Sequence, residues 1–418
     1  MMDERQALVP RLRFPEFRDA GEWRKTQLGK LGEFTGGGTP SKSNDSFWKG
    51  SIPWVSSSDI SEDSIHEIKI SRFITEEALE NSSTKLVPEG SILLVSRVGV
   101  GKLAITKSAV CTSQDFTNLT PYNDHLEFLG YFLKANAHAL EDLGQGMAIK
   151  GFTKEDITKL TVYLPEVEEQ QKIADCLSSL DALIAAQADK IDALKTHKKG
   201  LMQQLFPREG ETVPRLRFPE FQDAEKWEEK PISEIGEVVT GSTPSTSDKS
   251  LYGGRVMFVS PADISDQCFV TRTAKTLTKK GLSKARVIPA RSTLFVCIGS
   301  TIGKIAQNKY ECATNQQINA VIPFVNFLND FVYYALELAS ERIAEMAGRQ
   351  AVPIINKSLF STALLNVPAD KGEQKAVADC LSSLDELIVA HTEKLDALKN
   401  HKQGLMQQLF PVVEGVVS

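Results

Sequence analysis

The segments of this sequence whose residue types could support catalysis depart from the patterns of known catalytic sites. Residues 299–305, Gly-Ser-Thr-Ile-Gly-Lys-Ile, approach a phosphate-binding loop, but they are one residue short and end in Ile instead of Ser or Thr. Residues 99–103 fail for the same reason. The sequence has no Pro-Pro pair, Gly-x-Ser-x-Gly or His-Glu-x-x-His, and its six histidines are not clustered. We therefore predict that the chain catalyses nothing by itself and holds no metal.

Basic side chains gather in two stretches that lack acids, although the formal net charge of the chain is −6. Residues 90–114 hold three bases, and residues 267–310 hold nine. Such stretches are typical of phosphate-binding surfaces. The negative net charge of the whole chain does not exclude them, because a net charge does not show how charges are distributed locally. A solvated surface would show the same composition, so the assignment gains weight only from the recurrence of the stretches at related places.

Composition favours a reducing compartment. The six cysteines are scattered without a Cys-x-x-Cys pair, which indicates neither a disulfide framework nor a zinc ribbon. No run approaches the ~18 apolar residues of a membrane helix. We expect a cytoplasmic protein that does not enter a membrane.

An internal repeat with a shift of 204 residues organises the whole chain. Residues 9–17, Val-Pro-Arg-Leu-Arg-Phe-Pro-Glu-Phe, return unchanged as residues 213–221, and Thr-Pro-Ser at 39–41 returns at 243–245. Residues 168–207 match residues 372–411 at 28 of 40 positions. The segments between these blocks match loosely, so a nearly duplicated frame surrounds divergent interiors.

The repeated block predicts two long helices with a heptad seam, bounded by Pro165 and Pro207 and by Pro368 and Pro411. The seam residues are Ile173, Leu177, Leu180, Ile184, Ile191, Leu194, Leu201 and Leu205, then Val377, Leu381, Leu384, Ile388, Leu395, Leu398, Leu405 and Leu409. Four polar residues interrupt the seam, either to set the register or as solvated ends of long side chains: Gln187, Lys198, His391 and Lys402.

The two helices are predicted to pair with each other as an antiparallel coiled coil with pseudo-twofold symmetry. Each apolar stripe needs a partner, and the short connection after the first helix lets the chain run up one helix and down the other if the domains lie at opposite ends. The alternative is that each seam packs on its own globular domain.

The globular parts are predicted to be α+β. Residues 91–95 and 293–297 have the apolar, β-branched composition of strands, whereas residues 128–140 and 331–346 have helical spacing. The predicted boundaries are 1–165 for the first domain, 166–207 for its helix, 208–369 for the second domain, 370–411 for its helix, and 412–418 for a tail.

The chain resembles the specificity (S) subunit of a type I restriction-modification enzyme. The resemblance rests on Gly-Gly-Thr-Pro-Ser at 37–41 with Ile-Pro-Trp-Val at 52–55, on Asn-Gln-Gln-Ile at 315–318, and above all on the two helices that end in Gly-Leu-Met-Gln-Gln-Leu-Phe-Pro. It covers essentially the whole chain. The first copy departs from the second with Ser-Gln-Asp-Phe at 113–116, so contacts there should differ between the copies.

This resemblance implies two target-recognition domains, each of which reads one half of a bipartite, asymmetric site on double-stranded DNA. It also implies two modification (methyltransferase) subunits docked on the helices and two restriction (translocase/endonuclease) subunits. No cofactor is then expected on this chain, because S-adenosylmethionine, ATP and Mg²⁺ serve the partner subunits.

The predicted DNA contacts are of two kinds. Lysine and arginine side chains are expected to bind phosphates, and polar side chains are expected to contact the edges of the nucleobases. In the first domain they are Thr39, Ser41, Lys42, Ser57, Arg97, Lys102, Gln114 and Lys150. In the second they are Thr243, Ser245, Lys279, Lys280, Arg286, Lys304, Gln316, Gln317, Arg349 and Gln350.

Two alternatives remain open from the sequence. A coiled-coil scaffold that binds only proteins would leave the basic stretches incidental. A self-sufficient nuclease would use Asp59 with Glu67 and Lys69, but the second copy has Thr271 and Thr273 in place of the last two.

Overall fold

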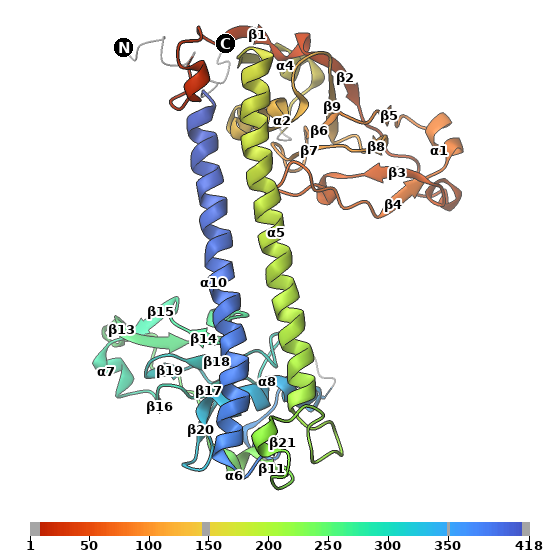
Figure 1. Cartoon of the computed structure of the whole chain (residues 1–418). Helices are drawn as coiled ribbons and strands as arrows, with labels where there is room; N and C mark the ends of the chain where they lie inside the picture. Colours follow the sequence, from red (N-terminus) through yellow and green to blue (C-terminus); the bar gives the residue numbers. More distant parts are fainter. Residues whose placement is uncertain (1–8, 144–150, 349–351, 412–418) are drawn as a thin grey trace. The chain divides into compact units, whose positions relative to one another are not determined.

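A computed structural model describes residues 9–143, 151–348 and 352–411. The chain forms two compact units: unit 1 comprises Met1–Gln187 and Leu395–Ser418, and unit 2 comprises Ala188–Lys394. Each unit contains one mixed domain of strands and helices, together with segments of two long helices, α5 (Val167–Leu205) and α10 (Lys371–Leu409) (Figure 1). The α+β class predicted from the sequence is confirmed.

The described residues of the unit 1 domain form three sheets, with strand orders β1-β10, β2-β9-β6-β7 and β4-β3-β8-β5. The strands are β1 (Arg24–Gln27), β2 (Gly32–Gly36), β3 (Ile52–Val55), β4 (Arg72–Ile74), β5 (Leu86–Val87), β6 (Ile92–Val95), β7 (Leu103–Ile105), β8 (Val110–Thr112), β9 (Phe116–Pro121) and β10 (Thr161–Leu164). The short helices are α1 (Glu76–Glu80), α2 (Leu126–Ala135), α3 (Ala137–Asp142) and α4 (Lys154–Lys159).

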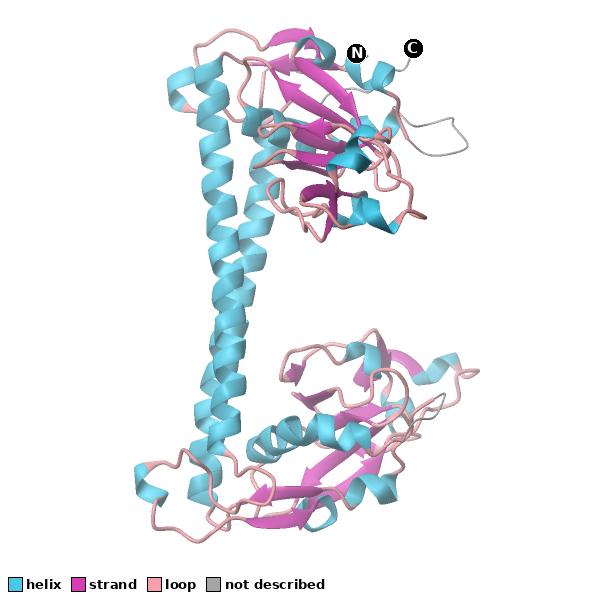
Figure 2. Ribbon diagram, turned by 90° about the vertical axis from the view of Figure 1, so that its right-hand side faces the viewer, coloured by secondary structure: helices cyan, strands magenta, loops and turns pink. Residues whose placement is uncertain are grey.

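Unit 2 repeats this plan, again with strands and helices in one domain (Figure 2). Its strand orders are β11-β21, β12-β20-β17-β18-β14 and β15-β13-β19-β16. The strands are β11 (Glu228–Pro231), β12 (Gly236–Thr240), β13 (Tyr252–Val259), β14 (Phe269–Val270), β15 (Lys275–Leu277), β16 (Val287–Ile288), β17 (Thr293–Val296), β18 (Ile305–Asn308), β19 (Cys312–Thr314), β20 (Ile318–Pro323) and β21 (Leu364–Val367). The helices are α6 (Ile232–Ile235), α7 (Lys279–Leu282), α8 (Asn329–Glu345) and α9 (Lys357–Ser361).

The central strand of each domain buries side chains on both of its faces, because another layer of the domain packs against each face. In β6, Ile92 and Leu94 join the cluster formed with α2 and the long helices, whereas Leu93 and Val95 join the cluster formed with the neighbouring sheet. Alternate residues of a strand point to opposite faces, so this division places the sheet between a helical layer and a second sheet. Strand β17 divides its residues between two clusters in the same way.

Within each unit the beginning of one long helix packs beside the end of the other, so the two segments are antiparallel. In unit 1, Ile173 and Leu177 of α5 share a core with Leu409 of α10. In unit 2, Leu205 of α5 shares a core with Leu381 of α10. All sixteen predicted seam residues are buried or half-buried. The predicted placement of the two domains at opposite ends of the helices stays a prediction.

The repeated nonapeptide forms a strap, residues 9–17 in unit 1 and residues 213–221 in unit 2, that joins the end of one long helix to the start of the other. The backbone N–H of Leu12 donates to the carbonyl of Gln408 at 3.0 Å. The next residue, Arg13, binds Glu169 of α5 with Nε at 2.8 Å and Nη2 at 2.6 Å. Arg217 binds Glu373 of α10 in the same bidentate way.

One predicted helix differs from the structure. Residues 128–140 were expected to form a single helix, but they belong to α2 and α3, which are separated at Asn136. The backbone N–H and the side-chain amide of Asn136 both donate to the carbonyl of Phe132, at 3.1 and 3.0 Å, and the Asn136 backbone, with φ −104° and ψ 27°, ends α2. The other predicted helix, residues 331–346, corresponds to α8.

Among the residues described, no helix is both long enough and apolar enough to span a bilayer.

Candidate nucleic-acid interface

Three connections of unit 1 meet at one edge of the domain: the β2–β3 loop, the β6–β7 loop and the β8–β9 turn. The backbone N–H of Gly38 donates to the carbonyl of Thr112 at 2.8 Å. The backbone N–H of Ser96, after β6, donates to the carbonyl of Asp115 in the β8–β9 turn at 2.7 Å. We call these three connections the loop cluster of unit 1.

The loop cluster of unit 2 is formed by the β12–β13 loop, the β17–β18 loop and the β19–β20 turn. Ser242 N–H donates to the Thr314 carbonyl at 2.9 Å, and Cys297 N–H donates to the Gln317 carbonyl at 2.8 Å. The approach is close enough to require glycine, because a Cβ atom at Gly241 would lie 2.1 Å from the carbonyl oxygen of Asn315. Both units therefore bring the same connections together.

Each loop cluster holds a threonine–glutamine pair that the sequence predicted as contact residues. The hydroxyl of Thr39 donates to Oε1 of Gln114, and the hydroxyl of Thr243 donates to Oε1 of Gln316 at 2.7 Å. Gln114 and Gln316 are both exposed. The threonine fixes the orientation of the glutamine amide at the surface, and an oriented amide is suited to reading base edges.

The other predicted residues of the β2–β3 and β12–β13 loops lie at the surface. Ser41 and Ser245 are exposed and each hydroxyl lies 2.8 Å from a second serine, Ser43 and Ser247 respectively. Lys42 is exposed. These loops therefore present hydroxyl and ammonium groups, which are common phosphate contacts.

The lysine and arginine residues predicted as DNA contacts in unit 2 have different hydrogen-bond partners. Arg286 reaches the loop cluster, because its Nη1 donates to the carbonyl of Thr240 at 2.6 Å. Lys280 of α7 donates to the hydroxyl of Ser250 at 2.9 Å. Lys279, next to it, is exposed. The carbonyl of Ile264 accepts from Lys304 Nζ at 3.3 Å, so this lysine is turned toward the loop after β13.

Two predicted residues of unit 1, Arg97 and Lys102, lie in the β6–β7 loop of the loop cluster, and a third, Ser57, lies beside the cluster. Lys102 forms an ion pair of 2.7 Å with Glu62, and Ser57 is half-buried in a short 3-10 helix after β3. Arg97 is exposed at the end of β6 and pairs through its backbone with Gly151. The remaining predicted residues, Lys150, Arg349 and Gln350, lie outside the described residues.

One residue of the loop cluster was missed by the sequence analysis. Asp115 occupies the position in unit 1 that Gln317 occupies in unit 2, and both accept a backbone N–H from the end of the central strand. The predicted contacts are hydroxyl, basic and amide side chains, so they include Gln317 and do not include the acidic Asp115. The loose match between the divergent segments carried the missing signal, because at a shift of 202 residues it aligns the two positions.

Asp59, the centre of the nuclease alternative, is committed to local structure. Its Oδ2 accepts the backbone N–H of Ser56 at 2.7 Å and also binds the guanidinium of Arg72. In the second copy the backbone N–H of Ser260 donates to Oδ2 of Asp263 at 2.9 Å in the same way. The other oxygen of Asp263 accepts the backbone N–H of Ala274 at 2.8 Å, and no arginine among the described residues is its partner there. Within residues 9–143, 151–348 and 352–411, no group of three His, Cys, Asp or Glu side chains could hold a metal ion.

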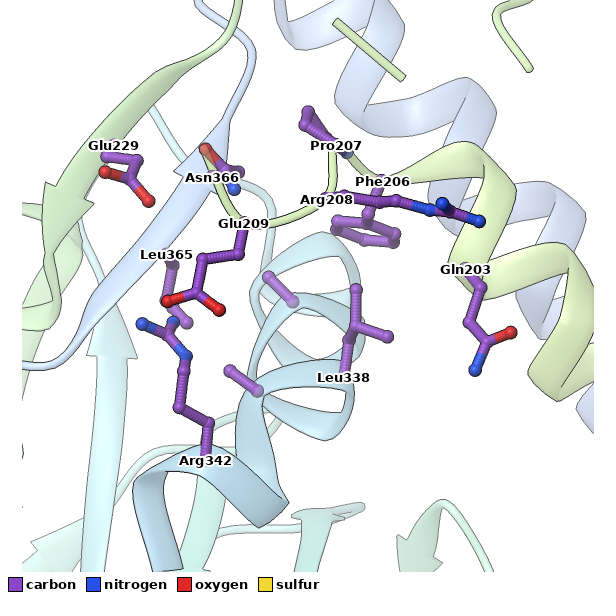
Figure 3. A pocket seen from close by; sticks show the side chains of 12 residues that line it. Gln203, Phe206, Pro207, Arg208, Glu209, Glu229, Leu338, Arg342, Leu365 and Asn366 are labelled. Atoms are coloured by element: carbon purple, nitrogen blue, oxygen red, sulfur yellow. The ribbon is translucent and has the colours of Figure 1, made fainter. Parts of the chain in front are cut away.

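A cavity of about 440 Å³ in unit 2 lies away from these loops, between the end of α5, α8 and β21 (Figure 3). Its walls are apolar at Phe206, Leu338 and Leu365, and the side chains of Glu209 and Arg342 point toward one another at its rim. The guanidinium of Arg342 also donates to the carbonyl of Leu364 at 2.5 Å. This cavity has no part in the loop cluster.

Similarity to known proteins agrees with the duplicated architecture. The type I restriction modification DNA specificity domain matches residues 20–196 and again residues 224–400. The chain is 24% identical over 420 residues to the type I restriction enzyme MjaIX specificity subunit of Methanocaldococcus jannaschii, covering 94% of this chain and 96% of that protein. It is 31% identical over 170 residues to the EcoR124I/EcoR124II specificity subunit of Escherichia coli, covering 39% of this chain and 41% of that one.

Solved structures support the fold. The crystal structure of the type I restriction-modification S subunit from M. genitalium superposes with a TM-score of 0.61 at 15% identity, covering 97% of this chain and all of that one. A second chain, from a study of complex assembly in a type I restriction-modification system, gives a TM-score of 0.58 at 16% identity and covers 93% of this chain and 97% of that chain. With its two matched domains, the chain belongs to the family of type I restriction-modification DNA specificity subunits, whose members supply sequence specificity while partner subunits carry the catalytic activities.

Proposed function

We propose that each loop cluster reads one half of a bipartite DNA site and that the two halves differ in sequence. The observation that carries this proposal is the same framework of loops, repeated in both units, with different residues at equivalent positions. Thr39 and Gln114 are matched by Thr243 and Gln316, whereas Asp115 is replaced by Gln317. A shared framework suits the common geometry of duplex DNA, and divergent side chains suit different bases.

Phosphate binding would come from the bases that surround the loop clusters. Lys42, Arg97 and Arg286 are exposed at or beside these loops. Because such contacts release counterions, we expect the affinity for DNA to fall steeply as the salt concentration rises. The net charge of −6 does not oppose this, since every acidic residue lies outside residues 267–310.

The two long helices would dock two modification subunits and, through them, two restriction subunits. The near identity of the helices, 28 of 40 positions, suits a partner that is the same at both copies. These partners would bring S-adenosylmethionine, ATP and Mg²⁺, and no such cofactor is assigned to this chain. We place this assembly in the cytoplasm, where cellular DNA is accessible to it.

The paired helices would also act as the ruler that sets the spacer between the half-sites. Removal of one heptad from both helices, residues 184–190 and 388–394, shortens each by ~10 Å, or about three base pairs. The permitted spacer should shorten accordingly, or the complex should fail to assemble. An intact complex with an unchanged spacer would count against the ruler.

A domain exchange tests the independent reading of half-sites. Residues 30–160 are replaced by the same region of another specificity subunit, and the chimaera is expressed with a modification subunit that assembles with the wild-type chain. The methylated motif should change in one half only. A change in both halves would contradict the proposal, and the other half of the motif serves as the control for folding and assembly.

A further inference from the structure

The β8–β9 turn and the β19–β20 turn have the same backbone and different side-chain chemistry. Asp115 and Gln317 occupy the third position of these turns. Their carbonyls accept the N–H groups of Ser96 and Cys297 at 2.7 and 2.8 Å. Both side chains are half-buried and lie beside the exposed middle residue of the turn. The backbone thus brings two unlike side chains to the same place in the two loop clusters.

Hydrogen bonds in unit 2 determine how the amide of Gln317 is oriented. The backbone N–H of Gln317 donates to Asn315 at 3.0 Å, so the accepting atom must be Oδ1. The Nδ2 of Asn315 is then the donor to Gln317, and it donates to Oε1 at 2.9 Å. The Nε2 of Gln317 therefore lies on the other side of its amide.

The position of Gly299 shows where this nitrogen lies. A Cβ atom at Gly299 would be 3.9 Å from Nε2 of Gln317, so the amide nitrogen borders the β17–β18 loop. Gly299 adopts a φ of +94°, a left-handed conformation that glycine adopts readily. Because Gly299 has no side chain, no side chain of that residue covers the two N–H donors of the Gln317 amide.

Asp115 presents the opposite polarity. The backbone N–H of Asp115 donates to the hydroxyl of Ser113 at 3.3 Å, and that hydroxyl donates to Oδ2 of Asp115 at 3.2 Å. An ionised carboxylate accepts hydrogen bonds and donates none. The turn is closed equally well by Ser113 with Asp115 and by Asn315 with Gln317, so closure of the turn does not explain the difference.

We propose that Asp115 and Gln317 are equivalent specificity-determining residues with opposite hydrogen-bonding polarity. Asp115 accepts from an exocyclic amine, N4 of cytosine or N6 of adenine, in one half-site. Gln317 donates to an acceptor edge, O6 or N7 of guanine or O4 of thymine, in the other. This inference rests on the proposed reading of one half-site by each loop cluster.

Two nearly isosteric substitutions, Asp115→Asn and Gln317→Glu, test the proposal. Each full-length variant is expressed with a modification subunit that assembles with the wild-type chain, and adenine methylation is mapped across the host genome. Asp115→Asn should lower methylation of the wild-type motif at least tenfold and change the preferred base at one position of its half-site. Gln317→Glu should do the same in the other half-site. In each variant the unaltered half-site is the control for folding.

A transplanted turn guards against simple loss of folding. The double substitution Ser113→Asn with Asp115→Gln gives unit 1 the turn that already folds in unit 2. It should convert one position of the first half-site from a base that donates to a base that accepts. Motifs that stay unchanged in the single and double variants, or that change in both halves at once, would overturn the inference. If the wild-type chain itself directs no bipartite motif, the proposed function fails instead.

Discussion

Lys402 of α10 lies 2.5 Å from Asp181 of α5, and together they hold the domain of unit 1 on both long helices. The carboxylate of Asp181 also accepts from the hydroxyl of Tyr131 in α2 at 2.6 Å, and Lys402 lies 5.1 Å from the centre of the Tyr131 ring. In unit 2, Lys198 pairs with Asp385, which accepts from Tyr334. Two of the polar residues that interrupt the apolar seam, Lys198 and Lys402, thus form ion pairs between the helices. They are not solvated ends of long side chains.

The Lys402–Asp181 pair should be strongly coupled, because both side chains are largely buried, with 10% and 14% of their surface exposed. Lys402→Met leaves a carboxylate without its cation, and the free energy of unfolding should fall by about 3 kcal/mol. A double-mutant cycle with Asp181→Asn, measured by urea unfolding, should give a clear interaction energy. Lys399→Met, at an exposed position of the same helix, is the control and should change little. Strictly additive effects of Lys402→Met and Asp181→Asn would show that the pair is not coupled.

Glu337 gives unit 2 a pH dependence of stability, because the pKa of its carboxyl is raised. Burial raises the pKa of Glu337, and the carboxylate of Asp385 adds to this, although Lys198 opposes it. Burial alone would lower the pKa of Lys198, but Glu337 and Asp385 outweigh it and the pKa is raised. One cation is therefore shared by two carboxylates, and Glu337 is the carboxylate whose charge is disfavoured.

Glu337→Gln should therefore stabilise unit 2 increasingly as the pH rises. Well below the ordinary pKa of 4.5, Glu337 is protonated in the folded and unfolded states, and the variant matches the wild type. Above that pH the unfolded chain loses the proton first, so the wild type loses stability relative to the variant until the pH passes the raised folded pKa. Urea unfolding between pH 4 and 8 measures the gap in the free energy of unfolding between Glu337→Gln and the wild type. Glu345→Gln, on the exposed side of α8, is the control. A gap that narrows with rising pH would contradict this account.

The Thr243 hydroxyl should contribute to reading of one half-site only. Thr243→Val keeps the shape of the side chain but removes the hydrogen bond that orients Gln316, so methylation of the cognate site should slow by about twofold to tenfold. Thr243→Ser should restore most of the rate because it keeps the hydroxyl. Thr39→Val is the matched variant for the other half-site. Rates on duplexes altered in one half at a time would reveal any effect on the wrong half.

The strap should stabilise unit 2 through the ion pair of Arg217 with Glu373, whose side chains are only 7% and 2% exposed. Arg217→Met leaves Glu373 buried without its cation and should destabilise the unit by about 3–5 kcal/mol. Arg217→Lys should recover only part of this because a lysine cannot bind a carboxylate in the bidentate way. Hydrogen exchange at residues 213–221 and in the first turns of α10 provides the measurement. Arg215→Met, exposed on the same strap, should leave exchange unchanged, and equal protection in all three variants would argue against this role.

The long helices could be predicted because periodicity and flanking prolines are local signals, and the repeat displayed them twice. The break at Asn136 could not, since it lies at a single residue whose backbone leaves the helical conformation while its side chain binds the carbonyl of Phe132. In the candidate site, Thr39 and Gln114 were both predicted as contacts, but nothing in the sequence indicated that they bind each other across 75 residues. The pairing of Lys102 with Glu62 was likewise invisible, because it depends on how distant loops meet.

The most direct measurement is a genome-wide map of adenine methylation in a host that has no other adenine methylation and that expresses this chain together with a modification subunit with which it assembles. The account predicts one motif with two dissimilar half-sites, separated by a fixed number of unspecified bases. A modification subunit that is active with this chain but methylates without such a motif, or at a motif with two identical halves, would contradict it.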